Sequence, residues 1–237
     1  MTTSGITLNQ LTRNQFIEAA LRKLNVLAQG QTPSTEDYTN GTLAFNNVIS
    51  EFRTLGMPLW ARNKYSFGLT LNVGSYNIGV GQTLNTPYPL HLVQAYRMET
   101  GSTTHIPMEI VADFNYNLFP QSSGGQPIQI TYQPKINMGV LQVWAIPDAS
   151  AVANSTVYIV YHRPIEYMNL STDTLDFPEE WNTPIIYQLA KRLAPEWGLP
   201  LQDRQMLSSE AEAVIARVLD FGFEDGSLFI QPSRGSH

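Results

Sequence analysis

The sequence predicts an α+β protein in which a helical bundle, formed by the N- and C-terminal segments, carries an inserted antiparallel β-sandwich-like domain. Apolar residues recur at helical spacing near both ends of the chain, and they alternate with polar residues through its middle. Strand patterns between two helical regions indicate an insertion into one helical body. The expected parts are a helical domain of residues 1–62 and 166–220, a β-rich domain of residues 63–165, and a C-terminal arm of residues 221–237.

The first predicted helix begins after Thr12. Thr12 and Gln15 have the spacing of a capping box, and apolar residues follow at helical spacing as far as Leu27, just before Gly30. A second helix is expected to begin after Ser34, a capping residue, and to end where a glycine and a proline follow its apolar stripe. Because the connection is short, the two helices are expected to pair antiparallel.

From about Tyr65 the spacing of apolar residues changes from helical to alternating. Tyr65, Phe67 and Leu69 alternate with small or polar residues, which is typical of a strand with one buried face. A helical turn is expected within residues 111–118, and further strands are expected at residues 90–98, 106–111, 128–133, 140–145 and 157–162. Short strands with frequent turns indicate a sandwich or barrel-like sheet rather than alternating β and α elements.

Helical spacing returns after Pro178. Apolar residues from Trp181 to Leu193 fall on one side of a predicted helix, and a further helix is expected from about Asp203 to Leu219. These helices and those at the N-terminus are the parts of the predicted bundle.

The C-terminal arm combines apolar residues with glycine and proline, and no helix of useful length is expected in it. A run of apolar residues exposed to water is unusual at a chain end, so the arm is expected to dock on a neighbouring subunit or, alternatively, on its own domain. The candidate interface residues, assigned below to a portal protein, are Phe221, Phe223, Leu228, Phe229 and Ile230.

Charged residues are scarce, at 14% of the chain against roughly 25% in an ordinary soluble protein. Asn, Gln, Ser and Thr replace them, which suits faces that end up against other protein, although a charge-poor monomer is the plain alternative. The net charge of −6 argues against tight, sequence-independent DNA binding. The absence of cysteine excludes disulfides and thiolate sites. No export signal and no membrane span are expected from the apolar pattern.

No catalytic, cofactor-binding or metal-binding residue is predicted. The four histidines lie far apart in the sequence, and Gly79-Val80-Gly81 lacks the third glycine of a dinucleotide loop. Glu179 and Glu180 are adjacent carboxylates at a helix start, where a capping role is favoured over catalysis.

Two arginines stand beside aromatic residues where the helical and β parts are expected to join. Arg62 ends the segment Trp60-Ala61-Arg62, and Arg163 ends the segment Tyr161-His162-Arg163. This arrangement is weak evidence for nucleic-acid binding. Arg62 and Arg163 are therefore predicted to be domain-junction residues.

Six short segments occur in an order that resembles the podovirus head-to-tail adaptors, also called packaged-DNA stabilisation, tail accessory or tail tubular proteins. The resemblance extends from about Thr12 to Leu219, and none of the segments is a catalytic signature. They are AALRKLNVLA at 19–28, GMPLWAR at 56–62, GSYNIG at 74–79, TPYP at 86–89, VWAIP at 143–147 and LAKRLAPE at 189–196.

The resemblance implies a structural virion protein, made in the host cytoplasm and located at the head–tail interface. Copies form a homo-oligomeric ring, commonly a dodecamer, beneath the portal protein, with helical bodies around the DNA channel and β domains outward. The C-terminal segment reaches the portal, and a distal tail or nozzle protein binds the other face. Genomic DNA passes without sequence-specific binding during ejection.

Two other function classes remain open at this point. A glycan-binding tail adhesin would use exposed aromatic residues such as Trp144 or Tyr158. A peptidoglycan hydrolase, an activity discussed for a few adaptors, would require Glu179 or Glu180 as the acid or base. The resemblance favours the adaptor over both.

Overall fold

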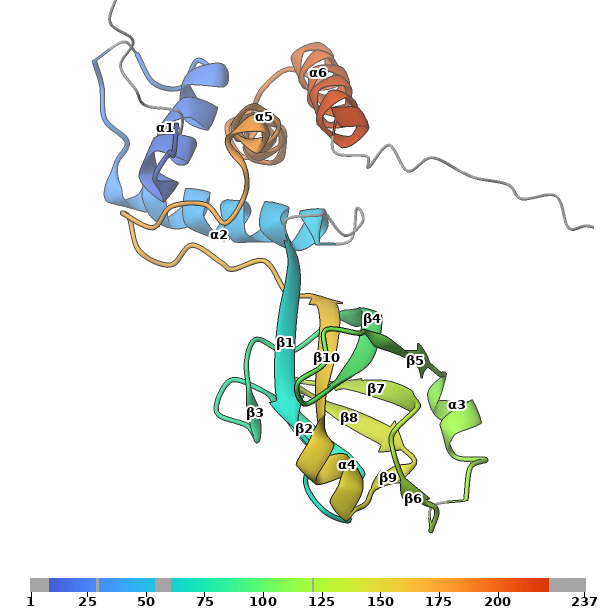
Figure 1. Ribbon diagram of the computed structural model, residues 1–237. Helices are drawn as coiled ribbons and strands as arrows, with labels where there is room; N and C mark the ends of the chain where they lie inside the picture. The colour runs from blue at the N-terminus through green and yellow to red at the C-terminus, as the bar shows by residue number, and fades with distance from the viewer. Residues whose placement is uncertain (1–8, 29, 54–60, 121, 222–237) are drawn as a thin grey trace, which may run out of the picture. The chain divides into compact units, whose positions relative to one another are not determined.

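The computed structural model describes residues 9–28, 30–53, 61–120 and 122–221, and it confirms the mixed α+β class. The chain divides into two compact units, shown in Figure 1. One, the helical unit, consists of Met1–Glu51 and Tyr167–His237; the other, the β unit, consists of Phe52–Glu166. Each unit is described by itself below.

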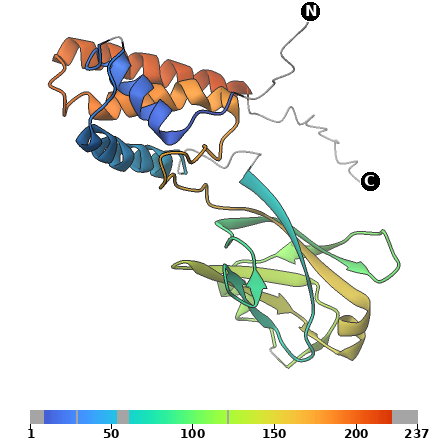
Figure 2. The same ribbon diagram turned by 90° about the vertical axis from the view of Figure 1, so that its left-hand side faces the viewer.

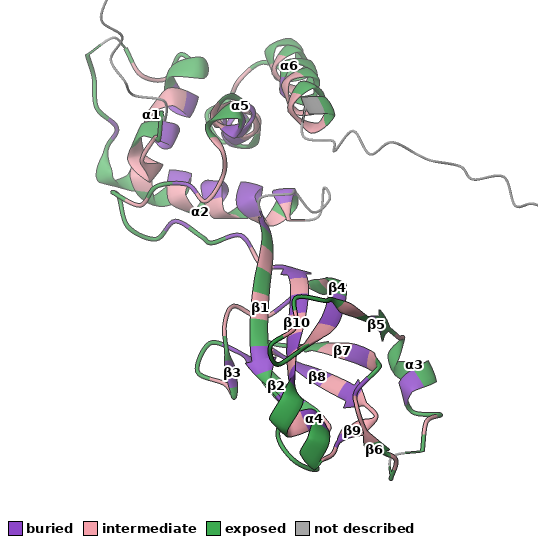
Figure 3. Ribbon diagram, viewed as in Figure 1, coloured by how far each residue is buried: buried purple, intermediate pink, exposed green. Residues whose placement is uncertain are grey.

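The helical unit contains four α-helices and one 3-10 turn in its described part, drawn in blue and orange in Figure 1. Their bounds are α1 (Arg13–Lys23), α2 (Thr35–Phe52), the 3-10 turn Glu179–Trp181, α5 (Asn182–Leu193) and α6 (Leu201–Phe221). Buried stretches, coloured purple in Figure 3, mark α1, α2 and α5, and in the core Phe16, Ile17, Phe45, Ile49, Ile185 and Leu189 are fully buried.

The capping box predicted for α1 is confirmed. The backbone N–H of Thr12 donates to Gln15 Oε1 at 2.8 Å, and the N–H of Gln15 donates to Thr12 Oγ1. The helix ends at Lys23, however, and not near Leu27. Asn25 adopts a positive φ of 57°, and the following N–H bonds back into the last turn, as in a Schellman ending.

Described segments from before and after the β unit meet in the helical unit. The helix α1 lies against α5, and Thr12 pairs with Thr174 in an isolated β-bridge. Lys23 Nζ donates to the hydroxyl of Tyr187 at 2.8 Å. The antiparallel pairing expected for α1 and α2 stays a prediction: α1 has α5 as its main backbone neighbour, and it meets α2 through side chains such as Phe16 and Phe45.

The β unit holds a curled, mostly antiparallel sheet of eight strands in the order β1-β10-β4-β5-β7-β8-β2-β3, which can be followed in Figures 1 and 2. A separate parallel pair joins β6 and β9. The bounds are β1 (Arg62–Gly68), β2 (Ser75–Gly79), β3 (Leu84–Asn85), β4 (His91–Glu99), β5 (Ile106–Ile110), β6 (Gly124–Gly125), β7 (Gln129–Lys135), β8 (Met138–Trp144), β9 (Ile146–Pro147) and β10 (Ser155–His162).

Both halves of the curled sheet pack on one apolar core. Phe67 of β1 and Ile159 of β10 belong to the same buried cluster as Ile78, Ile130 and Leu141 from the other half. Two short helices complete the unit: α3 (Asp113–Tyr116), where a helical turn was predicted, and α4 (Ala149–Asn154), which was not predicted. The sheet also contains the parallel pairs β2–β3 and β5–β7.

Strand register fixes which side chains share a face. On β1 the rings of Tyr65 and Phe67 face the core, so Lys64 and Ser66 face the other way. On β10 the same alternation places Tyr158, and every second residue on either side of it, on that outer side. The outer side of β1, β10 and β4 is called the outer sheet face below.

Candidate functional site

The outer sheet face gathers basic and aromatic side chains from three neighbouring strands. Register pairs Arg62 of β1 with His162 of β10, and His162 with His91 of β4. Two residues further along β1, Lys64 stands opposite Val160. Cross-strand neighbours lie about 5 Å apart, so these side chains form one continuous patch.

Aromatic rings form a ladder along the same face. The ring of Tyr96 stacks on Tyr158, with centroids 5.1 Å apart, and on His105, with centroids 4.2 Å apart. Lys64 Nζ lies 5.0 Å from the Tyr158 centroid and 5.2 Å from the Tyr96 centroid. Tyr96 is consequently buried although it stands on the outer side of the sheet.

The two imidazoles at the end of the patch are in direct contact. The rings of His91 and His162 are 4.8 Å apart between centroids; His91 is exposed, whereas only 3% of His162 is exposed. Burial lowers the pKa of the His162 imidazole, and the nearby positive charges of His91 and Arg62 lower it further. Nδ1 of His162 is buried without a hydrogen-bond partner in the described part of the chain.

Carboxylates are almost absent from this face. Among the residues of β1, β10 and β4 the single acidic residue is Glu99, and it pairs with Arg97 at 3.1 Å on the core side of the sheet. One strand further out, Glu109 of β5 accepts a hydrogen bond from Gln129 Nε2 at 2.8 Å. A chain with a net charge of −6 therefore carries a locally cationic face.

The structure places both predicted junction arginines where the chain enters and leaves the β unit. Arg62 opens β1, and Arg163 follows β10, where its backbone N–H donates to the carbonyl of Ala61 at 2.9 Å. Arg62 belongs to the outer sheet face, and Arg163 directs Nη1 to the carbonyl of Pro164. Their role in joining the two units stays a prediction.

Of the predicted portal-interface residues, Phe221 is the last residue of α6, so the helix extends into the segment that was expected to be irregular. The other four residues of that set lie outside the residues that the structure describes: Phe223, Leu228, Phe229 and Ile230.

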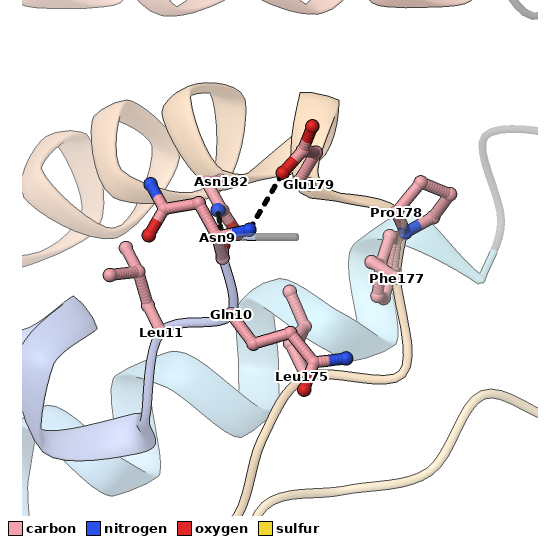
Figure 4. A pocket seen from close by; sticks show the side chains of 8 residues that line it. All are labelled: Asn9, Gln10, Leu11, Leu175, Phe177, Pro178, Glu179 and Asn182. Carbon is pink, nitrogen blue, oxygen red and sulfur yellow. Dashed lines mark hydrogen bonds between the residues drawn. The ribbon is translucent and has the colours of Figure 1, made fainter. Parts of the chain in front are cut away.

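Glu179 and Glu180 lie in the 3-10 turn before α5. Glu179 Oε2 accepts the backbone N–H of Asn9 at 2.7 Å, and Asn182 Nδ2 donates to the Asn9 carbonyl, as Figure 4 shows. The cavity beside them encloses about 40 Å³, room for roughly one water molecule. Glu179 thus fixes the N-terminal segment, its capping role stays a prediction, and the cavity is too small for a sugar ring.

The two aromatic residues considered for glycan binding are already in contact with other rings. Trp144 stacks on Phe119 with centroids 4.9 Å apart, and its Nε1 donates to the Pro120 carbonyl at 3.1 Å. Tyr158 stacks on Tyr96. Each therefore has a ring face covered by the protein itself.

Large apolar side chains are exposed on both units. On the β unit, Phe114 is 75% exposed and Ile136 is 92% exposed; on the helical unit, Met206 of α6 is 61% exposed. Of the α6 side chains that the structure describes, Ala211 alone is buried, and a stripe on the same helix is half-buried. This stripe, the α6 stripe, consists of Leu207, Val214, Ile215, Val218 and Leu219.

Comparison of the sequence with protein-family models gave no match, and comparison with curated proteins likewise gave none. Within the described residues, no group of three potential metal ligands comes together. In that same part of the chain, no helix combines the length and the apolar character that crossing a membrane requires.

Sequence reasoning named Arg62, Tyr158 and His162 separately but did not predict that they share the outer sheet face. Lys64, Tyr96, Tyr158 and His162 lie up to about a hundred residues apart in the chain, and only the pairing of β1, β10 and β4 brings them together. The recurrence of basic or aromatic residues at alternate positions of three predicted strands was the available indication.

Proposed function

We propose that the protein is a structural virion component, a head-to-tail adaptor of a short-tailed phage that forms a ring between the portal and the tail. The observation that carries the proposal is the compact unit built from both chain ends, with a β unit inserted between them. This is the order of parts that the resemblance to the adaptor family implies. The finer picture of a helical bundle carrying a β sandwich belongs to the same proposal.

Surface chemistry supports a role in assembly. Few like charges repel neighbouring copies of the chain. Covering the exposed apolar side chains with another protein lowers the free energy of the assembly. The 21-residue helix α6 packs on α5 and leaves the α6 stripe half-buried and Met206 exposed. A neighbouring copy or the portal would bury these residues.

The proposal also names the binding partners and the order of the assembly steps. Copies bind the portal after DNA packaging, close the ring, receive the distal tail or nozzle protein and let the genome pass during ejection. A single contact between two such charge-poor faces is weak. A multimeric portal offers many contacts at once, and this multivalency raises the overall affinity. The isolated chain is therefore expected to be a monomer or a weak oligomer.

A substitution on α6 tests the role of this helix in assembly. Met206→Glu places a charge at an exposed apolar position, so it is expected to abolish co-sedimentation of the chain with purified portal of the parent phage. Gln205→Glu adds the same charge at the neighbouring exposed position and is expected to retain binding.

Circular dichroism checks that both α6 variants remain folded. Equal binding by Met206→Glu and the unmodified chain would exclude α6 from the interface. If the unmodified chain does not bind the portal at all, the adaptor function itself is wrong.

A further inference from the structure

The hairpin between β7 and β8 carries an apolar side chain that faces water. Lys135 pairs with Met138 as the last pair of the two strands, which leaves Ile136 and Asn137 as a two-residue turn. Asn137 adopts a positive φ of 62°, as tight turns commonly require. Ile136 is 92% exposed, although turn positions usually carry polar residues. Lys135 and Ile136 are called the hairpin tip below.

The hairpin tip joins an exposed apolar side chain to a positive charge. Among the exposed large apolar side chains of the described residues, Ile136 is the only one with a basic residue next to it in the chain. Lys135 is exposed, and it makes no hydrogen bond or ion pair with another described residue. Both side chains of the hairpin tip are therefore available to a partner.

A pocket of the helical unit has the complementary chemistry. It lies where the end of α1, the start of α2 and the turn after α5 meet, and its volume is about 200 Å³, five times that of the cavity beside Glu179. Leu21 and Leu193 contribute buried apolar surface, and Trp197 contributes an indole ring that is 40% exposed. This pocket is called the Trp197 pocket, and its lining also includes Glu36, Asp37 and Glu196.

Carboxylates are the only charged groups that line the Trp197 pocket. Glu36 and Asp37 stand in the first turn of α2, where the helix dipole favours them, and Asp37 Oδ2 accepts the N–H of Ser34 at 2.8 Å. Glu196 follows the C-terminal end of α5, where the dipole disfavours a negative charge, and its carboxylate has no partner among the described residues. A cation bound in the pocket lowers the repulsion among the three carboxylates.

The other large pockets of the helical unit do not match the hairpin tip. The pocket between α1 and α2 is lined by Arg13 and by no carboxylate. The pocket beside the start of α6 is lined by Lys23 as well as by Asp203 and Glu210. Lys135 would meet a like charge in both pockets, so the Trp197 pocket is the complementary one.

We infer that the hairpin tip of one copy inserts into the Trp197 pocket of a second copy. Ile136 packs on the apolar surface of the pocket beside Trp197, and the Lys135 ammonium lies among the three carboxylates. The inference rests on the proposed function for the ring and deepens it, because it names two surfaces through which neighbouring copies touch. The tip and the pocket are different surfaces, so each copy can use both at once, and such head-to-tail contacts generate rings.

Zero-length carbodiimide cross-linking tests the inference, because it joins an ammonium to a carboxylate only where the two groups are in contact. The full chain has four lysines that can react: Lys23, Lys64, Lys135 and Lys191. An equal mixture of isotope-labelled and unlabelled chain at about 1 mM populates a contact whose Kd is in the millimolar range. Mass spectrometry is expected to find Lys135 joined to a carboxylate of the Trp197 pocket, in pairs that combine a labelled with an unlabelled chain.

A substitution at the hairpin tip separates a specific contact from simple attraction. Ile136→Asp retains Lys135, removes the apolar anchor and brings a carboxylate to a pocket that already holds three. It is expected to lower the yield of the cross-link about tenfold or more. Val80→Asp is the matched control, because Val80 is a 77% exposed apolar residue of the same unit. It is expected to change the yield less than about twofold.

A second pair of variants tests the pocket. Glu196→Arg places a positive charge where Lys135 is expected to bind, so it should lower the cross-link yield as Ile136→Asp does. Glu210→Arg makes the same change at an exposed position of α6 outside the Trp197 pocket, and it should leave the yield within about twofold. Circular dichroism checks that all four variants are folded.

Other outcomes overturn the inference. Cross-links confined to single chains would place the hairpin tip in the pocket of its own chain. Equal reaction of Lys23 or Lys64 with the pocket would mean diffuse attraction without a site. In a mixture with portal, pocket carboxylates that react with portal lysines and never with Lys135 would assign the pocket to the portal. If Lys135 forms no cross-link at all, the tip and the pocket do not meet.

The two proposals fail separately, because the cross-linking needs no portal. Cross-linked copies of a chain that does not bind the portal would retain this contact and reject the adaptor. A ring on the portal in which Lys135 forms no cross-link to the pocket would do the reverse. Met206, the position tested for portal binding, does not line the Trp197 pocket, so the variants report on different surfaces.

Discussion

His162 couples the stability of the β unit to pH. Burial, together with the positive charges of His91 and Arg62, lowers the pKa of its imidazole below the ordinary value of 6.5, so the folded protein keeps it neutral. The unfolded chain takes up the proton first as pH falls. Stability is therefore present above about pH 6.5 and is lost as pH decreases from there towards the lower pKa of the folded state.

The pH dependence of unfolding measures this coupling. The urea midpoint of the unmodified chain is expected to fall between pH 7.5 and 5.5, conditions that span the ordinary histidine pKa of about 6.5. His162→Gln is expected to flatten this dependence, whatever its effect on stability at pH 7.5. His105→Gln removes an exposed imidazole and is expected to leave the slope unchanged. An unchanged slope in His162→Gln would show that burial of this imidazole does not control the pH response.

Individual residues differed in how far the sequence could predict them. The pairing of Thr12 with Gln15 was readable because a capping box depends on spacing of three residues. The burial of His162 was not, because it arises from the strands and side chains packed around β10. Glu179 was predicted to cap its helix start, and nothing in the sequence indicated that it also binds Asn9, a contact between segments 170 residues apart.

At the scale of single elements, the close approach of α1 and α2 depends on a glycine. A Cβ added at Gly41 of α2 would lie 2.6 Å from Ile17 Cγ2, which is closer than van der Waals contact allows. Ile17 is fully buried, so it has little freedom to move aside. The glycine thus lets a helix interior pack tightly despite its low helix propensity.

Gly41→Ala is expected to destabilise the chain. The gain in helix propensity is about 1 kcal/mol, whereas overpacking in a core costs about 1–3 kcal/mol, so the free energy of unfolding should fall or at best stay equal. Asn47→Ala, at an exposed position of the same helix, should raise it by a few tenths of a kcal/mol. Urea denaturation compares the two variants. A clear increase in stability for Gly41→Ala would mean that the two helices are not closely packed there.

The elements themselves were largely predictable, and their ends and partners were not. The alternating pattern located β1, β4, β7 and β10 to within a few residues, because one face of each strand is buried. The end of α1 was misplaced because Asn25 adopts a left-handed conformation that glycine more often supplies. The helix α4 and the two-residue strands were missed because they are too short to show a period.

At the scale of the whole molecule, contacts between distant segments define the helical unit. Arg13 N–H donates to the Asp173 carbonyl at 3.0 Å, and Arg192 forms an ion pair with Glu51. Exposed pairs of this kind contribute little individually, so the packing of apolar faces from α1, α2 and α5 supplies most of the stability. The succession of helical and strand patterns along the sequence predicted an inserted unit. It did not predict how the strands are arranged in the sheet, nor the cationic outer sheet face.

The central claim is that this unit, closed by both chain ends, is a building block of a ring on the portal. Electron microscopy of purified portal mixed with the full chain tests it most directly. The account predicts a ring of added density at the distal end of the portal, one copy of the chain beside the next. Portal particles without added density, at chain concentrations well above those of the portal, would contradict it.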